Sequence, residues 1–210
     1  MKIAVLGATG RTGRPLVEQA LDGGHHVTAL ARTPSKLALD HPNLTVVQGD
    51  ALDAESVGRV VEGAEAVLLT LGHTKGSPPD LMERAARNVV AAMKRHGVRR
   101  VVTETGAGVA DARDPGGLGP AIMRGVMGLV AKNLLRDSEA HVDVFRQSGL
   151  DWTAVRAPRL TDGPVTGEYR TGYLALGPGH KVSRADVAEF MLLEAALGDF
   201  VGEAPMIAAV

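Results

Sequence analysis

The sequence predicts a single α/β domain, residues 1–210, built on a doubly wound, mostly parallel sheet with helices on both faces. Two observations carry this prediction. Short apolar runs rich in β-branched residues alternate with longer segments of helical period, and the first run leads directly into a glycine-rich turn. Near-continuous apolar runs are typical of strands that are buried on both faces, as in a parallel sheet.

Six of these runs are expected to form strands. They are residues 2–6, 26–31, 44–48, 66–71, 99–105 and 152–156. Strands that alternate with helices along the chain pair in parallel through right-handed crossovers, and this order favours the doubly wound architecture.

Five segments are expected to form helices, namely 11–22, 53–62, 79–96, about 132–148, and 184–197. The clearest is 80–96, because its apolar residues recur three and four positions apart and Gly97 follows where a helix C-terminal glycine is expected. Ser183 is a candidate N-cap for the last helix, with Asp186 three positions further on.

The remaining segments are expected to cover the substrate. Residues 106–131 and 157–182 are predicted to lie over the carboxyl ends of the strands, where ligands bind in this architecture. The stretch 118–135 is apolar, Met-rich and punctuated by glycines. It fits either a mobile lid over flat apolar rings or an ordinary core or dimer-contact helix. A monomer and a homodimer are both compatible with the sequence.

Composition excludes several classes of function. The formal net charge of −1 and an aromatic content of 3% argue against nucleic-acid binding. No apolar stretch is long enough for a membrane span, and the N-terminal apolar run is too short for a signal peptide, so we expect a cytoplasmic protein. The chain has no cysteine, and its seven histidines have no metal-ligand spacing, so no metal site is expected.

The turn "GATGRTG" at residues 7–13 predicts a dinucleotide site. Gly7 permits a tight turn, Gly10 lets the backbone approach a pyrophosphate, and Gly13 lets the following helix pack closely on the strand. Backbone N–H groups and the positive end of the helix then meet the anion. An ordinary tight turn is the alternative, and the correctly placed flanking strands and helix favour the cofactor site.

The end of the second expected strand favours NADP over NAD. NAD-binding folds place Asp or Glu there to accept a hydrogen bond from the ribose 2′-OH. This chain has no acidic residue from Val27 to Lys36 and carries Arg32 instead. A guanidinium matches a 2′-phosphate in bidentate geometry, whereas a carboxylate would repel it. A solvated surface arginine is the alternative interpretation of Arg32.

Two further strand ends contribute candidate cofactor contacts. Asp50 follows the third expected strand and could accept from the adenine amino group, or it could cap the next helix. Small residues in "LTLGH", residues 69–73, would let the backbone pass the nicotinamide ribose.

Five stretches together resemble one family: "KIAVLGATGRTG", "RNVVAAMKRHGVRRVV", "SGLDWTAVRAPRL", "TDGPVTGEY" and "VSRADVAEFML". They resemble the atypical short-chain dehydrogenases, the NmrA-like NAD(P)H-binding proteins, and within them the flavin and biliverdin reductases. The resemblance implies a Rossmann-type fold, NADPH as hydride donor, and flavins or bilins as acceptors. By motif position it implies cofactor contacts from Gly7, Thr9, Gly10, Arg11, Thr12, Gly13, Arg32, Asp50, Ala51, Leu71, Gly72, Thr105, Ala157 and Pro158.

The chain departs from the proteins that it resembles at the reactive end. The tyrosine and lysine pair that ordinary short-chain dehydrogenases use for proton transfer is absent, since neither Tyr169 nor Tyr173 is followed by a lysine four residues later. Gly106 stands where the resembled reductases carry a serine, and Arg159 where they carry a pocket histidine. Thr105 and Arg159 are therefore the candidate catalytic-site residues.

These features predict an NADPH-dependent reductase of a planar small molecule, of flavin, bilin or quinone-like type. Hydride passes from the nicotinamide to the stacked acceptor, and the protein mainly supplies orientation. The acceptor takes its proton from water, so the missing tyrosine and lysine are no obstacle. The alternative is a non-catalytic NADP-binding redox sensor of the NmrA-like type.

Overall fold

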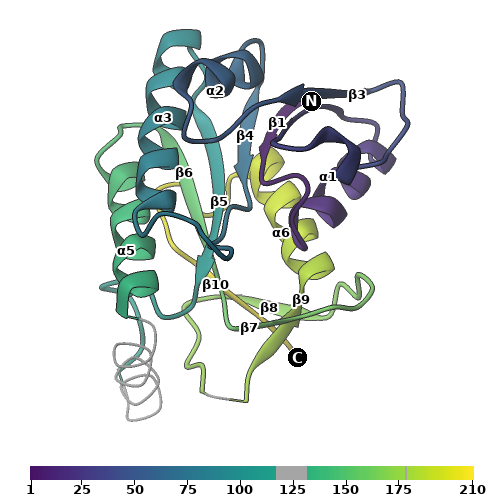
Figure 1. Ribbon diagram of the computed structural model, residues 1–210. Coiled ribbons are helices and arrows are strands. Elements are labelled where there is room, and N and C mark those ends of the chain that lie inside the picture. Colours follow the sequence, from purple (N-terminus) through teal and green to yellow (C-terminus); the bar gives the residue numbers. More distant parts are fainter. Residues whose placement is uncertain (117–131, 178) are drawn as a thin grey trace.

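The computed structural model describes residues 1–116, 132–177 and 179–210. A central sheet separates two groups of helices within these residues (Figure 1). The interpretation of 118–135 as a lid or a packed helix lies mostly outside the described residues, as does most of the expected covering segment 106–131, and only 132–135 are described, as the start of a helix.

Among the described residues, eight strands form the main sheet in the order β3-β2-β1-β4-β5-β6-β10-β8. Its neighbouring strands pair in parallel, except that β8 is antiparallel to β10. The order of the first six strands is that of a doubly wound dinucleotide-binding fold, which places the ligand crevice at the carboxyl ends of the strands. The bounds are β1 (Lys2–Leu6), β2 (His26–Ala31), β3 (Leu44–Gln48), β4 (Ala66–Leu69), β5 (Arg100–Gly106), β6 (Asp151–Ala157), β8 (Tyr169–Gly172) and β10 (Met206–Ala209).

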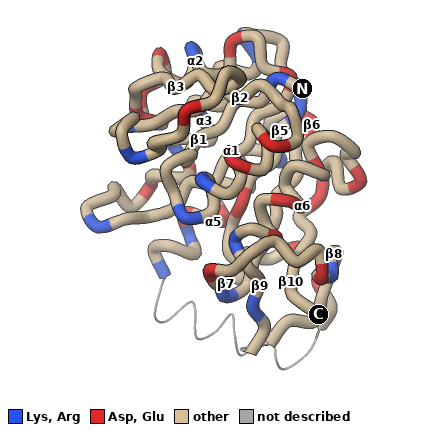
Figure 2. Tube along the Cα trace, turned by 90° about the vertical axis from the view of Figure 1, so that its right-hand side faces the viewer, with Lys and Arg blue, Asp and Glu red and all other residues tan. Residues whose placement is uncertain are grey.

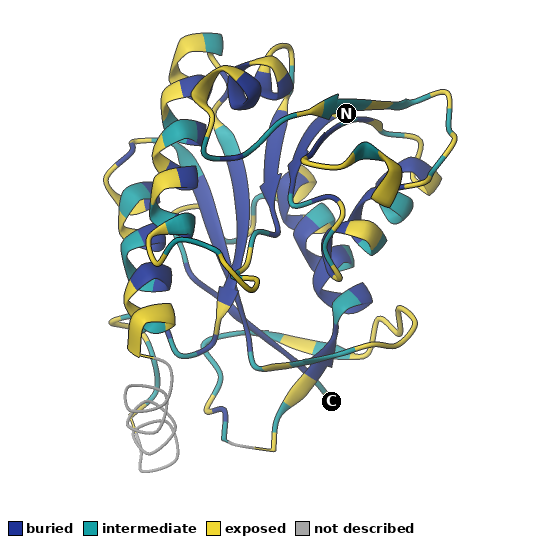
Figure 3. Ribbon diagram, in the orientation of Figure 1, coloured by how far each residue is buried: buried dark blue, intermediate teal, exposed yellow. Residues whose placement is uncertain are grey.

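Helices cover both faces of the sheet. On one face lie α1 (Gly13–Asp22) and α6 (Arg184–Leu197), and on the other lie α2 (Ala54–Val61), α3 (Leu81–His96) and α5 (Lys132–Arg146) (Figure 1). Strand β1 explains why both faces need cover. Ile3 and Val5 belong to the core cluster of α1 and α6, whereas Ala4 and Leu6 belong to the cluster of α2, α3 and α5. Figure 3 shows the resulting buried strands between helices with exposed outer faces.

The predicted strands and helices are confirmed, with shifts at their ends. The expected strand 66–71 ends at Leu69, and the helix expected from residue 11 begins at Gly13. Gly97 has a left-handed φ of +70° at the end of α3, and the Ser183 side chain accepts from the Asp186 backbone N–H. Both expected helix-terminal signals are therefore confirmed.

Short strands late in the chain escaped the sequence analysis. β7 (Arg159–Thr161) and β9 (Lys181–Ser183) form a separate two-stranded parallel sheet, while β8 and β10 extend the edge of the main sheet. Strands of three or four residues carry too little periodicity to be recognised without their partners. The expected role of 157–182 as a substrate covering stays a prediction.

Two surface features bear on the expected partners. Acidic and basic residues are interspersed over the face turned toward the viewer in Figure 2. In the part of the chain that the structure describes, no helix combines the length and apolar character that crossing a membrane requires.

Candidate functional site

The glycine turn packs tightly against the end of β4. Gly7 has a φ of +90°, and a Cβ atom there would lie 2.6 Å from the Thr70 carbonyl oxygen. A Cβ at Gly13 would overlap the Gly7 carbonyl oxygen, so only glycine lets α1 begin this close to β1. A Cβ at Gly10 would lie 3.0 Å from the same oxygen. Gly7 and Gly13 are thus required by the backbone itself, whereas a Cβ at Gly10 would make only a tight contact.

The turn opens onto a pocket of about 260 Å³ at the carboxyl ends of the first strands. Eight of the expected cofactor contacts line this pocket: Gly7, Thr9, Gly10, Arg32, Asp50, Ala51, Leu71 and Gly72. The other lining residues are Leu30, Lys36, Gly49, Thr70, Thr74 and Leu81. The pocket therefore gathers residues from four strand ends that are far apart in the sequence.

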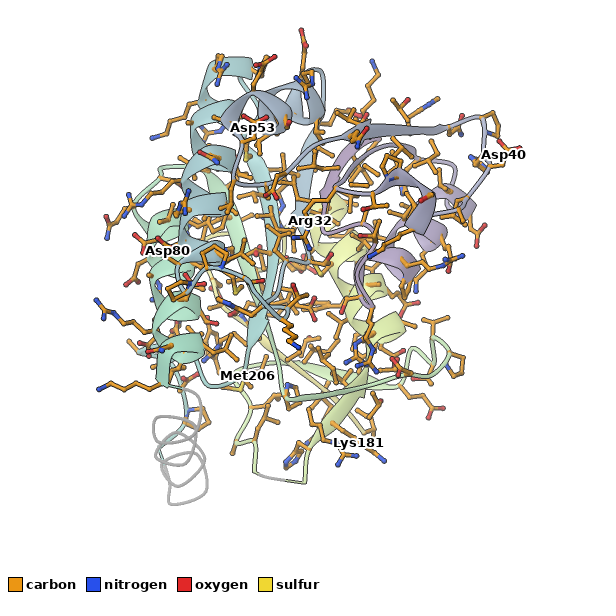
Figure 4. The ribbon with its side chains drawn as sticks, viewed as in Figure 1. Arg32, Asp40, Asp53, Asp80, Lys181 and Met206 are labelled. Carbon is orange, nitrogen blue, oxygen red and sulfur yellow. The ribbon has the colours of Figure 1, made fainter. Side chains whose placement is uncertain are left out.

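The side of the pocket formed after β2 is basic. Arg32 is exposed there, and the short 3₁₀ turn Pro34–Lys36 brings Lys36 to the same lining. In Figure 4, Arg32 lies near the middle of the view, between the helices of the two faces. Asp50 is the one carboxylate among the described residues that line this pocket. Two cations at this position suit an anionic group such as a phosphate.

Asp50 does not cap the helix that follows it. Its Oδ1 accepts from the Leu52 backbone N–H at 2.9 Å, while Asp53 caps α2 through the N–H groups of Glu55 and Ser56. The alternative interpretation of Asp50 as a helix cap is therefore wrong. A second carboxylate three residues later takes that role, and Oδ2 of Asp50 accepts no hydrogen bond from any residue that the structure describes.

Arg11, Thr12 and Gly13 lie outside the lining of the pocket. Arg11 is exposed and pairs with Asp162, which also accepts from Arg184 at 2.7 Å. The glycine turn is thereby tied to the segment after β7. Gly13 supports the pocket indirectly, through the packing of α1.

Thr12 contacts a buried acid that the sequence analysis did not single out. Its hydroxyl donates to Oε1 of Glu104 at 3.2 Å, from the first turn of α1 to β5. Burial raises the pKa of the Glu104 carboxyl to about 7, although the Thr12 hydrogen bond and the Arg184 charge oppose the rise. The strand sequence "VVTET" gives no sign that Glu104 is buried beside Thr12, because the two residues are 92 positions apart and share no local pattern.

The candidate catalytic residues, Thr105 and Arg159, lie at the end of β5 and the start of β7. Thr105 is 5% exposed, and its hydroxyl oxygen has no hydrogen-bond partner among the described residues. Gly106 pairs in register with Ala157, which is buried, and Pro158 connects it to Arg159, which is exposed at the start of β7. A buried hydroxyl without a partner costs stability, and it points to a ligand that would supply the missing hydrogen bond.

A second acid near this edge also escaped the sequence analysis. Asp137 of α5 is buried, and its Oδ2 lies 2.6 Å from Nε2 of His73, which follows the pocket residue Gly72. The two residues are separated by 64 positions, so no spacing in the sequence could relate them.

Comparison with known proteins places this geometry in context. A family model described as NAD(P)H-binding matches residues 7–196. An uncharacterised chloroplastic protein of Arabidopsis thaliana is 30% identical over 178 residues, which cover 79% of this chain and 61% of that protein. A reductase of Streptomyces griseus named for (4-alkanoyl-5-oxo-2,5-dihydrofuran-3-yl)methyl phosphate is 30% identical over 154 residues, covering 73% of this chain and 46% of that protein.

Among solved structures, the fold is similar to that of ChuY, an anaerobillin reductase from Escherichia coli O157:H7. The TM-score is 0.80 at 22% identity, over 99% of this chain and 96% of that chain. This likeness supports the Rossmann-type fold. The chain spans 61% and 46% of the lengths of the two relatives named above, so it matches only part of each.

Proposed function

This chain belongs to the NAD(P)H-binding family, and on that premise we propose that it is an NADPH-dependent reductase of a planar conjugated acceptor, of flavin, bilin or quinone-like type. The observation that carries the proposal is the pocket beside the glycine turn, which is basic where an NAD site would be acidic.

The pocket residues fit the adenosine end of NADPH. The backbone of the turn and the first turn of α1 would hold the pyrophosphate. Arg32 and Lys36 would hold the 2′-phosphate, and the free Oδ2 of Asp50 would accept from the adenine amino group. Leu71 and Gly72 continue the pocket along the end of β4, toward the end of β5.

The reactive end would lie at the ends of β5 and β6. NADPH supplies a hydride there when it is bound. The buried hydroxyl of Thr105 would hold the carboxamide or ribose of the nicotinamide half, which would supply the hydrogen-bond partner that it lacks. Exposed Arg159 would attract an anionic acceptor by its phosphate or carboxylate groups.

One relative supports the class of acceptor. The name of the Streptomyces griseus reductase describes an unsaturated ring that carries carbonyl groups and a phosphate. Such a ring combines conjugation with an anionic group, as FMN and bilins do. Arg159 would serve any acceptor of this kind, because a guanidinium binds phosphate and carboxylate alike.

The test is turnover of NADPH, followed by its absorbance, with FMN, riboflavin, biliverdin and a quinone offered in turn. Steady oxidation with at least one acceptor supports the reductase. Tight NADPH binding without turnover of any acceptor would contradict it and support the alternative, an NADP-binding redox sensor. Binding is measured separately by calorimetric titration, so a failure to bind cofactor is distinguished from a failure to react.

A further inference from the structure

His73 lies at the rim of the pocket, between two of its lining residues. Gly72 and Thr74 line the pocket on either side of it, and the His73 side chain is 22% exposed. Its Nε2 lies 2.6 Å from Oδ2 of Asp137. Because a carboxylate only accepts, Nε2 of His73 carries the hydrogen. Its Nδ1 makes no hydrogen bond with any residue that the structure describes.

Asp137 is held rigidly beneath this histidine. Its side chain is 2% exposed and also accepts from the backbone N–H groups of Met82 at 2.9 Å and Glu83 at 3.0 Å. These N–H groups belong to the first turn of α3, whose own N-cap residue, Asp80, makes no capping hydrogen bond. Asp137 thus caps α3 from a neighbouring helix, and the helix N-terminus stabilises its negative charge.

A neighbouring contact shows how far along the direction of β5 Asp137 lies. His141 of α5 lies 2.7 Å from the Thr103 hydroxyl of β5 and 2.9 Å from the Met82 carbonyl. Thr105 follows Thr103 by two strand residues, about 6.6 Å. Asp137 precedes His141 by four helical residues, about 6 Å. Since α5 runs opposite to β5, both steps lead toward the carboxyl edge, and Thr105 lies at the level of Asp137.

The loop after β4 and the end of β5 therefore present His73 and the unpartnered Thr105 hydroxyl at the same edge and on the same face of the sheet. β4 and β5 are adjacent, with Leu69 opposite Thr103. Two polar groups thus lie at neighbouring strand ends, the buried Thr105 hydroxyl and the Nδ1 atom of His73. Neither has a hydrogen-bond partner among the described residues, so a ligand bound at this edge would supply the missing partners.

We propose that His73, oriented by Asp137, is the proton donor for acceptors that take up a proton together with hydride. This proposal rests on the reductase function proposed above. A histidine held by a carboxylate is a recurrent acid–base arrangement, because the carboxylate orients the ring and stabilises its protonated form.

The step balances without any further reactant. The C4–H bond of the nicotinamide breaks, and its hydride forms a C–H bond on the acceptor. The electron pair displaced within the acceptor takes the proton from Nδ1 of the protonated His73, which is left neutral. Water then reprotonates the ring. The acceptor is reduced by two electrons, and the cofactor is oxidised by two.

The acidic residues at the start of α3 are paired with arginines of the same helix. On α3, Glu83 pairs with Arg87 and Asp80 lies 3.7 Å from Arg84, both at the surface. On α5, Arg136 is exposed, and burial lowers the pKa of His141, which keeps that ring neutral. From β5 the neighbours are Thr103 and Thr105, which carry no charge.

The variant that tests the proposal is His73→Gln, with His26→Gln as the matched control. A glutamine amide still donates a hydrogen bond toward Asp137, and His26 is exposed at the start of β2, at the opposite edge of the sheet. Thermal unfolding and NADPH affinity are measured first for both variants, and neither is expected to change. FMN and biliverdin then serve as acceptors. Reduced flavin exchanges its N–H protons with water and needs no donor from the protein, whereas the bilin must gain a proton as it is reduced.

With biliverdin, kcat of His73→Gln should fall about 100-fold or more. With FMN, kcat should fall less than about tenfold. An unchanged kcat with biliverdin would overturn the proposal, since a mere tether between the β4 loop and α5 predicts that result.

A second measurement separates this proposal from the proposed function. If the unmutated protein turns over none of the four acceptors offered above, the reductase function fails, and the ring resonances of His73 are then followed by NMR as NADP⁺ is added. The same resonances test the role of His73 if other acceptors are reduced and biliverdin is not. A shift of the His73 resonances, with those of His26 unmoved, supports a group that faces the cofactor. Resonances that do not move would overturn the proposal.

Discussion

At the scale of single residues, Arg32 bears most directly on cofactor choice, because it is exposed in the pocket beside Lys36 and no acidic residue occurs from Val27 to Lys36. Arg32→Ala should weaken NADPH binding by about ten- to a hundredfold, the loss of one charge-assisted phosphate contact worth roughly 1.5–3 kcal/mol. Affinity for NADH should barely change. Calorimetric titration of both cofactors checks this, with the exposed Arg87→Ala as control. Equal NADPH and NADH dissociation constants in the unmutated protein would contradict the prediction.

Arg159 should decide affinity for the acceptor rather than the rate of reaction. It is exposed at the start of β7, so its loss removes an attraction and leaves the fold intact. Arg159→Ala should raise KM for FMN several-fold and lower kcat by less than about tenfold. Riboflavin lacks the phosphate, and its KM should stay the same. Steady-state kinetics with the two flavins compares them directly, and an equal rise in both KM values would refute a phosphate contact.

Thr105 offers a test that separates stability from function. Its buried hydroxyl lacks a partner, so Thr105→Val, which keeps the shape of the side chain, should stabilise the cofactor-free protein by about 1 kcal/mol. The same change should weaken NADPH binding, because the cofactor loses its hydrogen bond to the Thr105 hydroxyl. Denaturant unfolding and calorimetric titration measure the two effects. Thr103→Val is the control, since its hydroxyl is bonded to His141 and its loss should destabilise.

At the scale of elements, the start of α1 depends on Gly13. A Cβ there would overlap the Gly7 carbonyl, a backbone atom that cannot yield without moving the helix, so Gly13→Ala should cost about 3 kcal/mol or more of stability. Gly72 lines the pocket with open space around its Cβ position. Gly72→Ala should therefore keep the melting temperature and lower NADPH affinity. Thermal unfolding and titration of both variants check the contrast, which would fail if Gly13→Ala melted like the unmutated protein.

At the scale of the whole molecule, Glu104 should make folding stability depend on pH. Its pKa is about 7 in the folded protein against an ordinary 4.5. Below pH 4.5 both states hold the proton, and Glu104 has no effect. Between 4.5 and 7 only the unfolded state releases it, so stability falls as pH rises, and above 7 the loss is complete at about 3 kcal/mol. Glu104→Gln should match the unmutated protein at pH 4 and exceed it by about this amount at pH 8.

The measurement is denaturant unfolding across this pH range. Glu62→Gln, an exposed change of the same charge, is the control for the overall field of the protein. The glutamine oxygen still accepts from Thr12, so the variant keeps the hydrogen bond that joins α1 to β5. A stability difference that does not change between pH 4 and pH 8 would show that the pKa of Glu104 is the same in the folded and unfolded protein.

The sequence by itself determined what depends on neighbouring residues. Alternating apolar runs and helical segments predicted the strand and helix order, because burial imposes a period on residues that are close in the chain. The turn at 7–13 predicted the tight loop at the end of β1, and local signals placed Gly97 and Ser183 at helix ends. These features need no knowledge of which elements meet.

Only the tertiary structure decided which distant residues meet. The strands β7 to β10 are too short to be stable alone and exist through their pairing with one another and with β6. Asp137 became the cap of α3 and the partner of His73, and Glu104 became a buried acid beneath Thr12. The physical reason is the same in each case: a side chain's burial and partners are set by packing between elements, and packing is not periodic along the chain.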